Sequence, residues 1–203
     1  MIKTHKELIY YMKADLMMNR GCFSLSLGKR LKNFFVPDLI MSYLTNLRKY
    51  EYYGNTKNVM KYWYKYQVHC LGIKLGFSIS PNVFGFGLVI PHYGTIVVGN
   101  SGNKVGNYCV LHTSTCITSG KKIIGDGFYL STGAKVVHDI QLFDNISVGA
   151  NSIVNKSIDG DGYLIAGAPA KKIKHSDPWY IRDGAEFTRR HSECERLRES
   201  YLL

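Results

Sequence analysis

Apolar residues recur at every sixth position through much of the second half of the chain. From residue 124 to residue 154 this step has no exception, and small or apolar residues follow four positions later. Two earlier runs keep the same step, with short insertions between the runs. The heads of the repeats are Phe84, Ile90, Ile96, Val105, Leu111, Ile117, Ile124, Leu130, Val136, Leu142, Val148 and Val154. A period of six fits neither an amphipathic helix, with a period of about 3.6, nor a half-buried strand, with a period of about 2.

These repeats predict a triangular coil of parallel strands. Each repeat forms one short strand and one corner, and three repeats complete a turn. The head of each repeat points inward and stacks on the head one turn below, about 4.8 Å away. Glycine and asparagine are frequent where the corners are expected, because the backbone must turn sharply there. The pattern therefore predicts a mainly β protein built around a parallel β-helix.

The first 72 residues and the tail lack the repeat and show helical patterns. Thr4 precedes apolar residues at helical spacing, and two further apolar segments run over residues 34–47, around Pro37, and 58–71. They predict two or three helices that cover the first turn of the coil. The tail, with alternating charges, predicts another helix. The expected domains are a helical region (1–72), a β-helix domain (73–174) and a helical tail (175–203).

The positive charge lies mostly in the N-terminal part of the chain. The formal net charge is +11, residues 1–75 hold thirteen Lys or Arg against four acids, and residues 52–125 hold no acid at all. Such a surface attracts polyanions: nucleic acid, anionic lipid head groups or phosphorylated small molecules. No helix-turn-helix, RNA-binding or zinc-finger motif accompanies the charge, which argues against nucleic acid. Peripheral contact with a membrane stays open.

Targeting and cysteine patterns narrow the class of protein further. The first residues mix Lys and Glu with apolar residues and do not read as a secretory signal, and no apolar run reaches the roughly 18 residues of a membrane span. The five cysteines are odd in number and lack a C-x-x-C pair, so we expect neither a disulfide framework nor a zinc site. We expect a cytoplasmic protein, in position to work at the inner face of the membrane.

Two histidines are expected to meet on one side of the coil. Ile90 and Leu111 head repeats three apart, so His92 and His112, which follow them closely, lie on adjacent turns. His138 follows a repeat head on another face. A histidine on a rigid coil beside a second histidine is a candidate general base for a hydroxyl group. The alternative is a pair of corner residues hydrogen-bonded to backbone, and no third ligand completes a metal site.

Four segments resemble the left-handed β-helix acyltransferases, and within them the serine O-acetyltransferase-like branch. The resemblance covers Gly76–Lys172, about half of the chain, and supplies the left-handedness of the coil. AGAPAKKIK is typical of the family, and GLVIPHYGTIVVGN is typical of the branch. The matching segments are GLVIPHYGTIVVGN (87–100), VGNYCVLHTSTCIT (105–118), IIGDGFYLSTGAKVV (123–137) and AGAPAKKIK (166–174).

The resemblance implies an acetyl-CoA-dependent enzyme that works as a homotrimer, with sites between neighbouring coils. His92 would be the general base that lets a hydroxyl attack the thioester directly, and His112 would support it or contact the acceptor. Backbone amides would stabilise the oxyanion. CoA would lie along a groove of the coil. The positions implied for CoA binding are Gly133, Ala134, Ala150, Ala168, Lys171 and Lys172.

The chain departs from serine acetyltransferases at positions that matter for the acceptor. Ser78 stands where their D-I-H-P segment has the Asp that orients the base, and Pro91 stands where a second Asp precedes it. The loop that carries Gly-Asp-Arg-His-Pro in those enzymes is missing between Ile117 and Ile123. Free serine therefore lacks evident partners in the sequence. The pattern resembles the branch of bacterial surface-polysaccharide pathways, which implies O-acetylation of a saccharide hydroxyl, on an acceptor that the membrane can carry as a lipid-linked saccharide.

Four other functions stay open at this point. Serine O-acetyltransferase belongs to the same class, as does N-acetyl transfer to an amino sugar. A non-catalytic β-helix scaffold and a metal-dependent hydratase belong to other classes. The sequence does not choose the sugar, the hydroxyl or the acyl chain.

Overall fold

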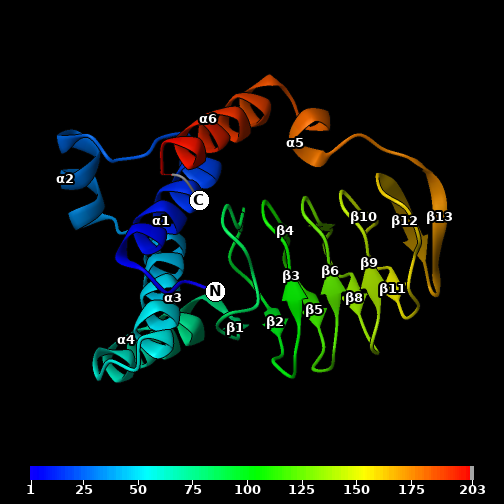
Figure 1. Ribbon diagram of the computed structural model, residues 1–203, viewed down its shortest axis with the longest axis horizontal. Coiled ribbons are helices and arrows are strands. Elements are labelled where there is room, and N and C mark those ends of the chain that lie inside the picture. The colour runs from blue at the N-terminus through cyan, green and yellow to red at the C-terminus, as the bar shows by residue number, and fades with distance from the viewer. Residues whose placement is uncertain (202–203) are drawn as a thin grey trace.

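The computed structural model describes residues 1–201, which form a helical region, a β-helix and a returning tail (Figure 1). Four helices precede the coil, where the sequence predicts two or three. The additional helix is α2, whose end takes Phe34 and Phe35, because Pro37 separates these residues from the segment that follows. The helices are α1 (His5–Arg20), α2 (Leu27–Phe35), α3 (Leu39–Asn55) and α4 (Met60–Leu75).

The start of α1 shows how local sequence sets these boundaries. The Thr4 hydroxyl accepts a hydrogen bond from the Glu7 N–H, and the Glu7 carboxylate accepts one from the Thr4 N–H at 2.7 Å. This reciprocal capping satisfies donors that a helix start leaves open. The predicted N-terminus of the first helix is confirmed. No helix among residues 1–201 is long and apolar enough to cross a membrane.

The coil consists of three sheets, in which the parallel strands come from successive turns. We name them sheets A, B and C. Sheet A contains β1 (Phe77–Ile79), β2 (Ile96–Val98), β5 (Thr115–Ile117), β8 (Lys135–Val136) and β11 (Ile153–Val154). Sheet B contains β3 (Lys104–Val105), β6 (Ile123–Ile124) and β9 (Gln141–Leu142). Sheet C contains β4 (Val110–Leu111), β7 (Tyr129–Leu130), β10 (Ser147–Val148), β12 (Tyr163–Gly167) and β13 (Ala170–His175).

The predicted register is confirmed throughout the coil. Leu111 pairs with Leu130 and Leu130 with Val148, so residues three repeats apart stack on one face. All twelve heads of the repeats are buried, with at most 5% of each side chain exposed. Stacked aliphatic side chains of this kind form the core of a parallel β-helix.

Corner residues on one side of the coil hold successive turns together. Oδ1 of Asp126 accepts the Asn107 N–H at 2.7 Å, and Oδ1 of Asp144 accepts the Asp126 N–H at 2.8 Å. Asp161 continues the series by accepting the Asp144 N–H. A Cβ at Gly125 would collide with the Asp144 carboxylate, which explains the glycine there. Each corner thus has its backbone donor satisfied by the turn that follows.

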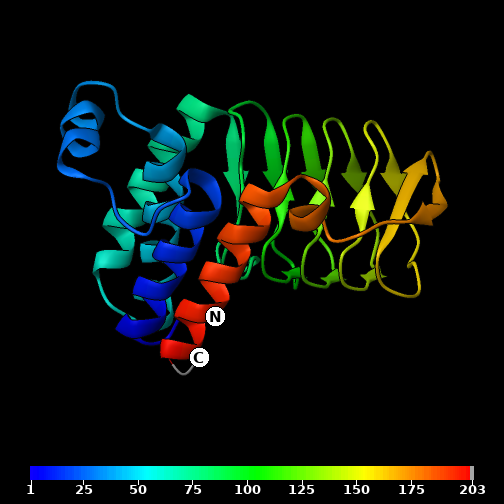
Figure 2. The same cartoon turned by 90° about the horizontal axis from the view of Figure 1, so that it is seen from above.

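The tail turns back along the coil and packs against the helical region (Figure 2). The antiparallel pair β12–β13 closes the far end of the coil, and α5 (Trp179–Arg182) and α6 (Ala185–Tyr201) follow. The buried Trp179 donates from Nε1 to the Tyr108 carbonyl at 2.7 Å, and the Arg190 guanidinium donates to the Met18 carbonyl at the end of α1. The tail is helical as predicted, and it spans the length of the molecule.

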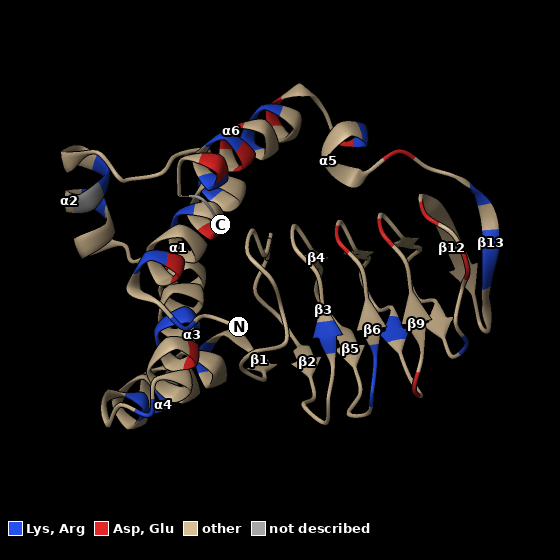
Figure 3. Ribbon diagram, viewed as in Figure 1, with Lys and Arg blue, Asp and Glu red and all other residues tan. Residues whose placement is uncertain are grey.

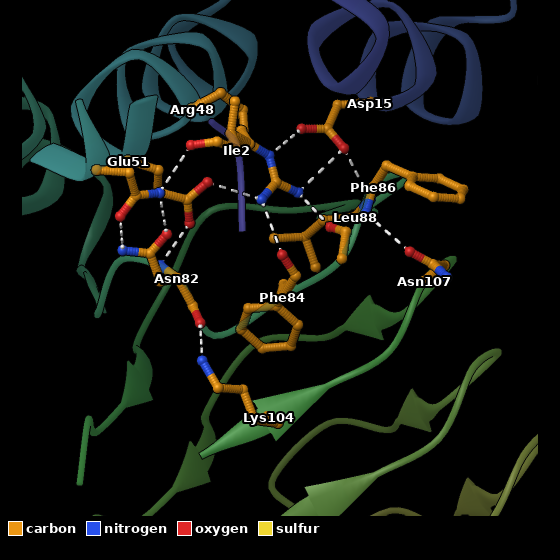
Figure 4. A network of polar contacts seen from close by, with 12 residues as sticks. Ile2, Asp15, Arg48, Glu51, Asn82, Phe84, Phe86, Leu88, Lys104 and Asn107 are labelled. Carbon is orange, nitrogen blue, oxygen red and sulfur yellow. Dashed lines mark hydrogen bonds and ion pairs between the residues drawn. The ribbon is translucent and has the colours of Figure 1, made fainter. Parts of the chain in front are cut away.

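A buried arginine joins the helices to the first turn of the coil (Figure 4). Arg48 is fully buried on α3, and its guanidinium pairs with Asp15 of α1 at 2.7 Å and with Glu51 at 3.1 Å. It also donates to the carbonyls of Phe84, at 3.0 Å, and Gly85. The ion pairs and hydrogen bonds of Arg48 offset the free-energy cost of burying both carboxylates away from water.

Replacement of Arg48 by Met tests this joint. Arg48→Met leaves two buried carboxylates without a cation, so we expect a loss of about 3–5 kcal/mol in the free energy of unfolding at pH 7. Burial already raises the pKa of Glu51, an effect that Arg48 opposes. The loss should shrink at pH 5, because protonation removes the uncompensated charge. Denaturant unfolding at the two pH values measures both effects.

Arg196→Met is the matched control, because Arg196 is exposed on α6. It should change the free energy of unfolding by no more than about 0.5 kcal/mol. An equal effect of the two substitutions would show that the buried pairing contributes nothing particular to stability.

Candidate active site

His92 and His112 lie on the corner that follows sheet C, one turn apart. Val89 pairs with Val110, so the residues after Ile90 and after Leu111 stack on each other. The structure therefore brings the two histidines together, as the spacing predicts. The His92 side chain is exposed, and that of His112 is half-buried. Because of this difference in exposure, the His92 imidazole can contact a ligand, whereas the His112 imidazole is held by its neighbours.

A tyrosine that the sequence analysis did not single out fixes the orientation of His112. Nε2 of His112 lies 2.7 Å from the Tyr129 hydroxyl. Tyr129 directly precedes the head of its repeat and pairs with Val110, so its ring points outward beneath His112. Its outward position one turn below Val110, two residues before His112, was the signal in the sequence that could have identified it.

The surroundings of His112 keep its imidazole neutral. Burial lowers the pKa of His112 below its ordinary value of 6.5, and the nearby His92 lowers it further. Asp183, just after α5, acts in the opposite direction. Burial raises the pKa of Tyr129, and Asp183 raises it as well. A neutral imidazole next to a neutral phenol can share one hydrogen bond without a net charge.

The helix α5 brings two further charged residues to this face. The Arg182 guanidinium lies 4.9 Å from the centre of the Tyr129 ring, donates to the Ser147 hydroxyl at 2.9 Å and pairs with Asp183 at 2.9 Å. Their position depends on the docking of Trp179, which no local pattern in the sequence predicts. The structure thus adds a cation and an anion beside the histidine pair.

A cavity of about 470 Å³ continues from Tyr129 along sheet C toward the end of the coil. Its lining combines hydroxyl groups with cationic side chains, and the basic residues of β13 and α5 are visible in Figure 3. We call this cavity the sheet C groove; it is lined by Tyr129, Ser131, Ser147, Leu164, Lys174, His175, Ser176, Asp177 and Arg182. Cations and hydroxyl groups in a groove suit a phosphorylated ligand.

The structure places most of the predicted cofactor-binding residues below the histidine pair. Gly133 donates its N–H to the Thr113 carbonyl, and the corner with Ala150 stacks below it, so these positions continue the corner of His112. Ala150 and Ala168 are exposed. Lys171 and Lys172 lie on β13, with the Lys172 ammonium 3.9 Å from the centre of the Tyr163 ring.

Ala134 does not belong with this set. Its side chain is fully buried in the core of the coil, its N–H donates to the Ser131 carbonyl, and its carbonyl accepts from the Cys116 N–H. The head-plus-four position in the repeat points inward, which the family pattern alone did not reveal. The Ala134 side chain therefore packs in the core, and the contact with the cofactor that the resemblance implies stays a prediction.

The remaining sequence candidates lie elsewhere. His138 is exposed after sheet A, with Nδ1 3.4 Å from the Asn155 carbonyl, and is separate from the pair as predicted. Ser78 faces outward on β1 of sheet A, where it pairs with Val97. Among residues 1–201, no group of three or more His, Cys, Asp or Glu side chains could hold a metal ion.

The chain is similar to serine acetyltransferases over about half of its length. It is 28% identical to that of Synechococcus elongatus over 116 residues, which are 53% of this chain and 47% of the relative. It is 29% identical to that of Staphylococcus aureus over 123 residues, 57% of this chain and 56% of the relative. The chain thus spans about half the length of the curated relatives it matches. No protein-family model matches it.

Solved serine acetyltransferase structures share the fold. One, in complex with CoA, superposes with a TM-score of 0.61 at 17% identity and covers 81% of this chain and 68% of its own. Another, from Neisseria gonorrhoeae, gives a TM-score of 0.57 at 21% identity, with 85% and 66% covered. The predicted left-handed β-helix with N-terminal helices and a C-terminal helix is thereby confirmed.

The environment of His112 predicts a pH dependence. Since its native pKa lies below 6.5, the unfolded chain takes up this proton at a higher pH than the native protein does. The free energy of unfolding should therefore fall as the pH falls below about 6.5. NMR titration of the imidazole should give a midpoint below 6.5, and His112→Gln should remove that signal and reduce the acid loss of stability. A midpoint at or above 6.5 would contradict the assignment.

Proposed function

We propose that this chain is an acetyl-CoA-dependent O-acetyltransferase of the serine acetyltransferase type. The observation that carries the proposal is the pair of imidazoles next to Tyr129, which contacts His112 and lines the cationic sheet C groove. The similarity to serine acetyltransferases supports the same chemistry. A groove with hydroxyl groups and cations beside a pair of histidines can hold an acyl donor and an acceptor at once.

His92 is the general base in this proposal. It takes the proton from the acceptor hydroxyl while the oxygen attacks the thioester carbonyl of acetyl-CoA. The tetrahedral intermediate collapses, the C–S bond breaks, and the sulfur of CoA takes the proton from the imidazolium. The exposed position of His92 allows both partners to reach it. Backbone N–H groups of the neighbouring corner stabilise the oxyanion.

His112 positions the reacting groups rather than taking the proton. Its Nε2 is engaged with the Tyr129 hydroxyl, and its lowered pKa keeps it uncharged beside His92. A neutral neighbour allows His92 to become an imidazolium without repulsion from a second positive charge. Tyr129 therefore belongs to the same machinery through His112.

The CoA moiety lies along the corner below the histidines in this proposal. Gly133, Ala150 and Ala168 provide backbone or small surfaces, and Lys171 and Lys172 provide cations for its phosphates. Lys174 and Arg182 in the sheet C groove add cations that the sequence analysis did not include. The exposed His92 of a single chain is consistent with a homotrimer in which a neighbouring coil completes the site. A cytoplasmic location agrees with a CoA-dependent reaction.

L-Serine is the acceptor that the comparisons favour over a saccharide. The curated relatives and the solved structures similar to this chain are serine acetyltransferases. Near His112, α5 also supplies one cation and one anion, Arg182 and Asp183. In the structure these two groups pair with each other at 2.9 Å, and in this proposal they bind the carboxylate and the ammonium of a free amino acid instead. The sequence had given no candidate for these partners.

A saccharide hydroxyl is the second candidate acceptor. Ser78 and Pro91 occupy the positions where serine acetyltransferases have acids, and the loop between Ile117 and Ile123 stays short. A saccharide has no amino and carboxylate groups for the missing loop to enclose. A sugar of a surface polysaccharide therefore remains the alternative substrate.

The reaction itself gives the test. Release of the CoA thiol from acetyl-CoA should require L-serine and should produce O-acetylserine. His92→Ala should lower kcat by about 100- to 10,000-fold, because it removes the general base. His138→Ala is the matched control, since this histidine is exposed on another face, and it should leave kcat within about twofold.

Each remaining outcome decides between the functions. Acetylation of saccharides but not of serine would replace the acceptor, and acetylation of an amino sugar at nitrogen would replace the reaction type. Full activity of His92→Ala would refute the assigned base. A protein that neither binds CoA nor releases its thiol with any of these acceptors would be a scaffold.

A further inference from the structure

The helix α2 exposes an apolar face to solvent at the end of the molecule away from the coil (Figure 1). Leu27, Leu31, Phe34 and Phe35 stand at helical positions i, i+4, i+7 and i+8, which share one face. Between 64% and 84% of each of these residues is exposed. A lone exposed apolar residue needs no explanation, but four large ones on a single helical face indicate a partner.

The polar side of α2 points toward the protein instead. Lys29, Lys32 and Asn33 line a cavity of about 730 Å³ between α2 and the helices α1 and α3. The Asn33 side chain accepts the Asp38 N–H at 2.6 Å, and Asp38 pairs with Arg20 at 2.6 Å. These contacts fix the C-terminal end of α2 next to α1 and α3. Its amphipathicity is thus reversed with respect to a surface helix that packs on its own core.

The charge around this face is positive. α2 carries three basic residues and no acid, and residues 1–75 hold thirteen Lys or Arg against four acids. Every one of these acids is already engaged: Asp15 and Glu51 by Arg48, Asp38 by Arg20, and Glu7 by backbone donors at the start of α1. No unpaired carboxylate of the helical region offsets the lysines.

We propose that α2 docks this end of the protein on an anionic lipid bilayer. Leu27, Leu31, Phe34 and Phe35 enter the boundary between head groups and acyl chains. Lys29 and Lys32 border the cavity on the other side of α2 but are also exposed, and their long side chains extend from there to the phosphates. A second copy of the chain fits the face less well. A symmetric contact would set the same cationic surface against itself, which like charges disfavour. The docking is independent of the proposed acetyl transfer.

A second exposed stripe provides a rival surface on α4. Tyr62, Trp63 and Tyr66 are each more than half exposed, and α4 also lacks acids. Its aromatic residues pack partly among themselves, with the Tyr66 ring 6.3 Å from that of Trp63. The experiment must therefore distinguish α2 from α4.

Sedimentation of the full-length protein with vesicles tests the proposal. We expect binding to vesicles that contain phosphatidylglycerol, little binding to pure phosphatidylcholine, and a loss of binding as salt rises. Phe34→Ser should weaken binding about tenfold, because it removes one large inserted side chain. Lys29→Gln combined with Lys32→Gln should weaken binding and reduce its dependence on salt.

The controls separate docking from damage. Phe143→Ser is the matched variant, since Phe143 is an exposed phenylalanine on the coil, and it should bind as the unmodified protein does. No preference for anionic vesicles, or unchanged binding by Phe34→Ser, would refute the proposal. Loss of vesicle binding in Trp63→Ser, with binding retained in Phe34→Ser, would also refute it and would assign the docking surface to α4. If the protein does not bind vesicles but self-associates in a way that Phe34→Ser abolishes, the apolar face of α2 would be assigned to a second copy of the chain.

Discussion

The first turn of a β-helix has no turn beneath it, so its backbone groups need other partners. In this protein the helical region supplies them. The Arg48 guanidinium takes the carbonyls of Phe84 and Gly85, the Asp15 carboxylate accepts the Leu88 N–H at 2.9 Å, and Glu51 accepts the Asn82 N–H at 2.7 Å. One buried ionic cluster thus replaces the missing turn, and every later turn, including the one with His112, stacks on the result.

The sequence predicts the coil well because the six-residue step is a local rule. Each head of a repeat needs only its neighbour a turn away, so the pairing of Leu111 with Leu130 follows from counting. The meeting of His92 and His112 follows in the same way. The inward direction of Ala134 follows from the repeat as well, because it stands four positions after the head Leu130.

Contacts between distant segments are what the sequence does not reveal. Asp183 lies near His112 only because Trp179 docks against the Tyr108 carbonyl, 71 positions before it. The position of Arg182 depends on the same docking of Trp179. The preference for serine over a saccharide as the proposed acceptor depends on it as well. The missing acids at Ser78 and Pro91 point away from serine, whereas the charged pair after Trp179 points toward it. The first feature lies in the first turn of the coil and the second in the tail, and neither segment predicts the other.

The constant spacing between turns also fixes the distances between sites along the coil. The corner of His112 and the closing β12–β13 pair are separated by three steps, through β7, β10 and β12, or about 14 Å at the spacing of parallel strands. A ligand that contacts both ends is therefore selected by its length as well as by its chemistry. Addition or loss of one whole turn would leave every side-chain contact within a turn intact and still change which molecules span the interval.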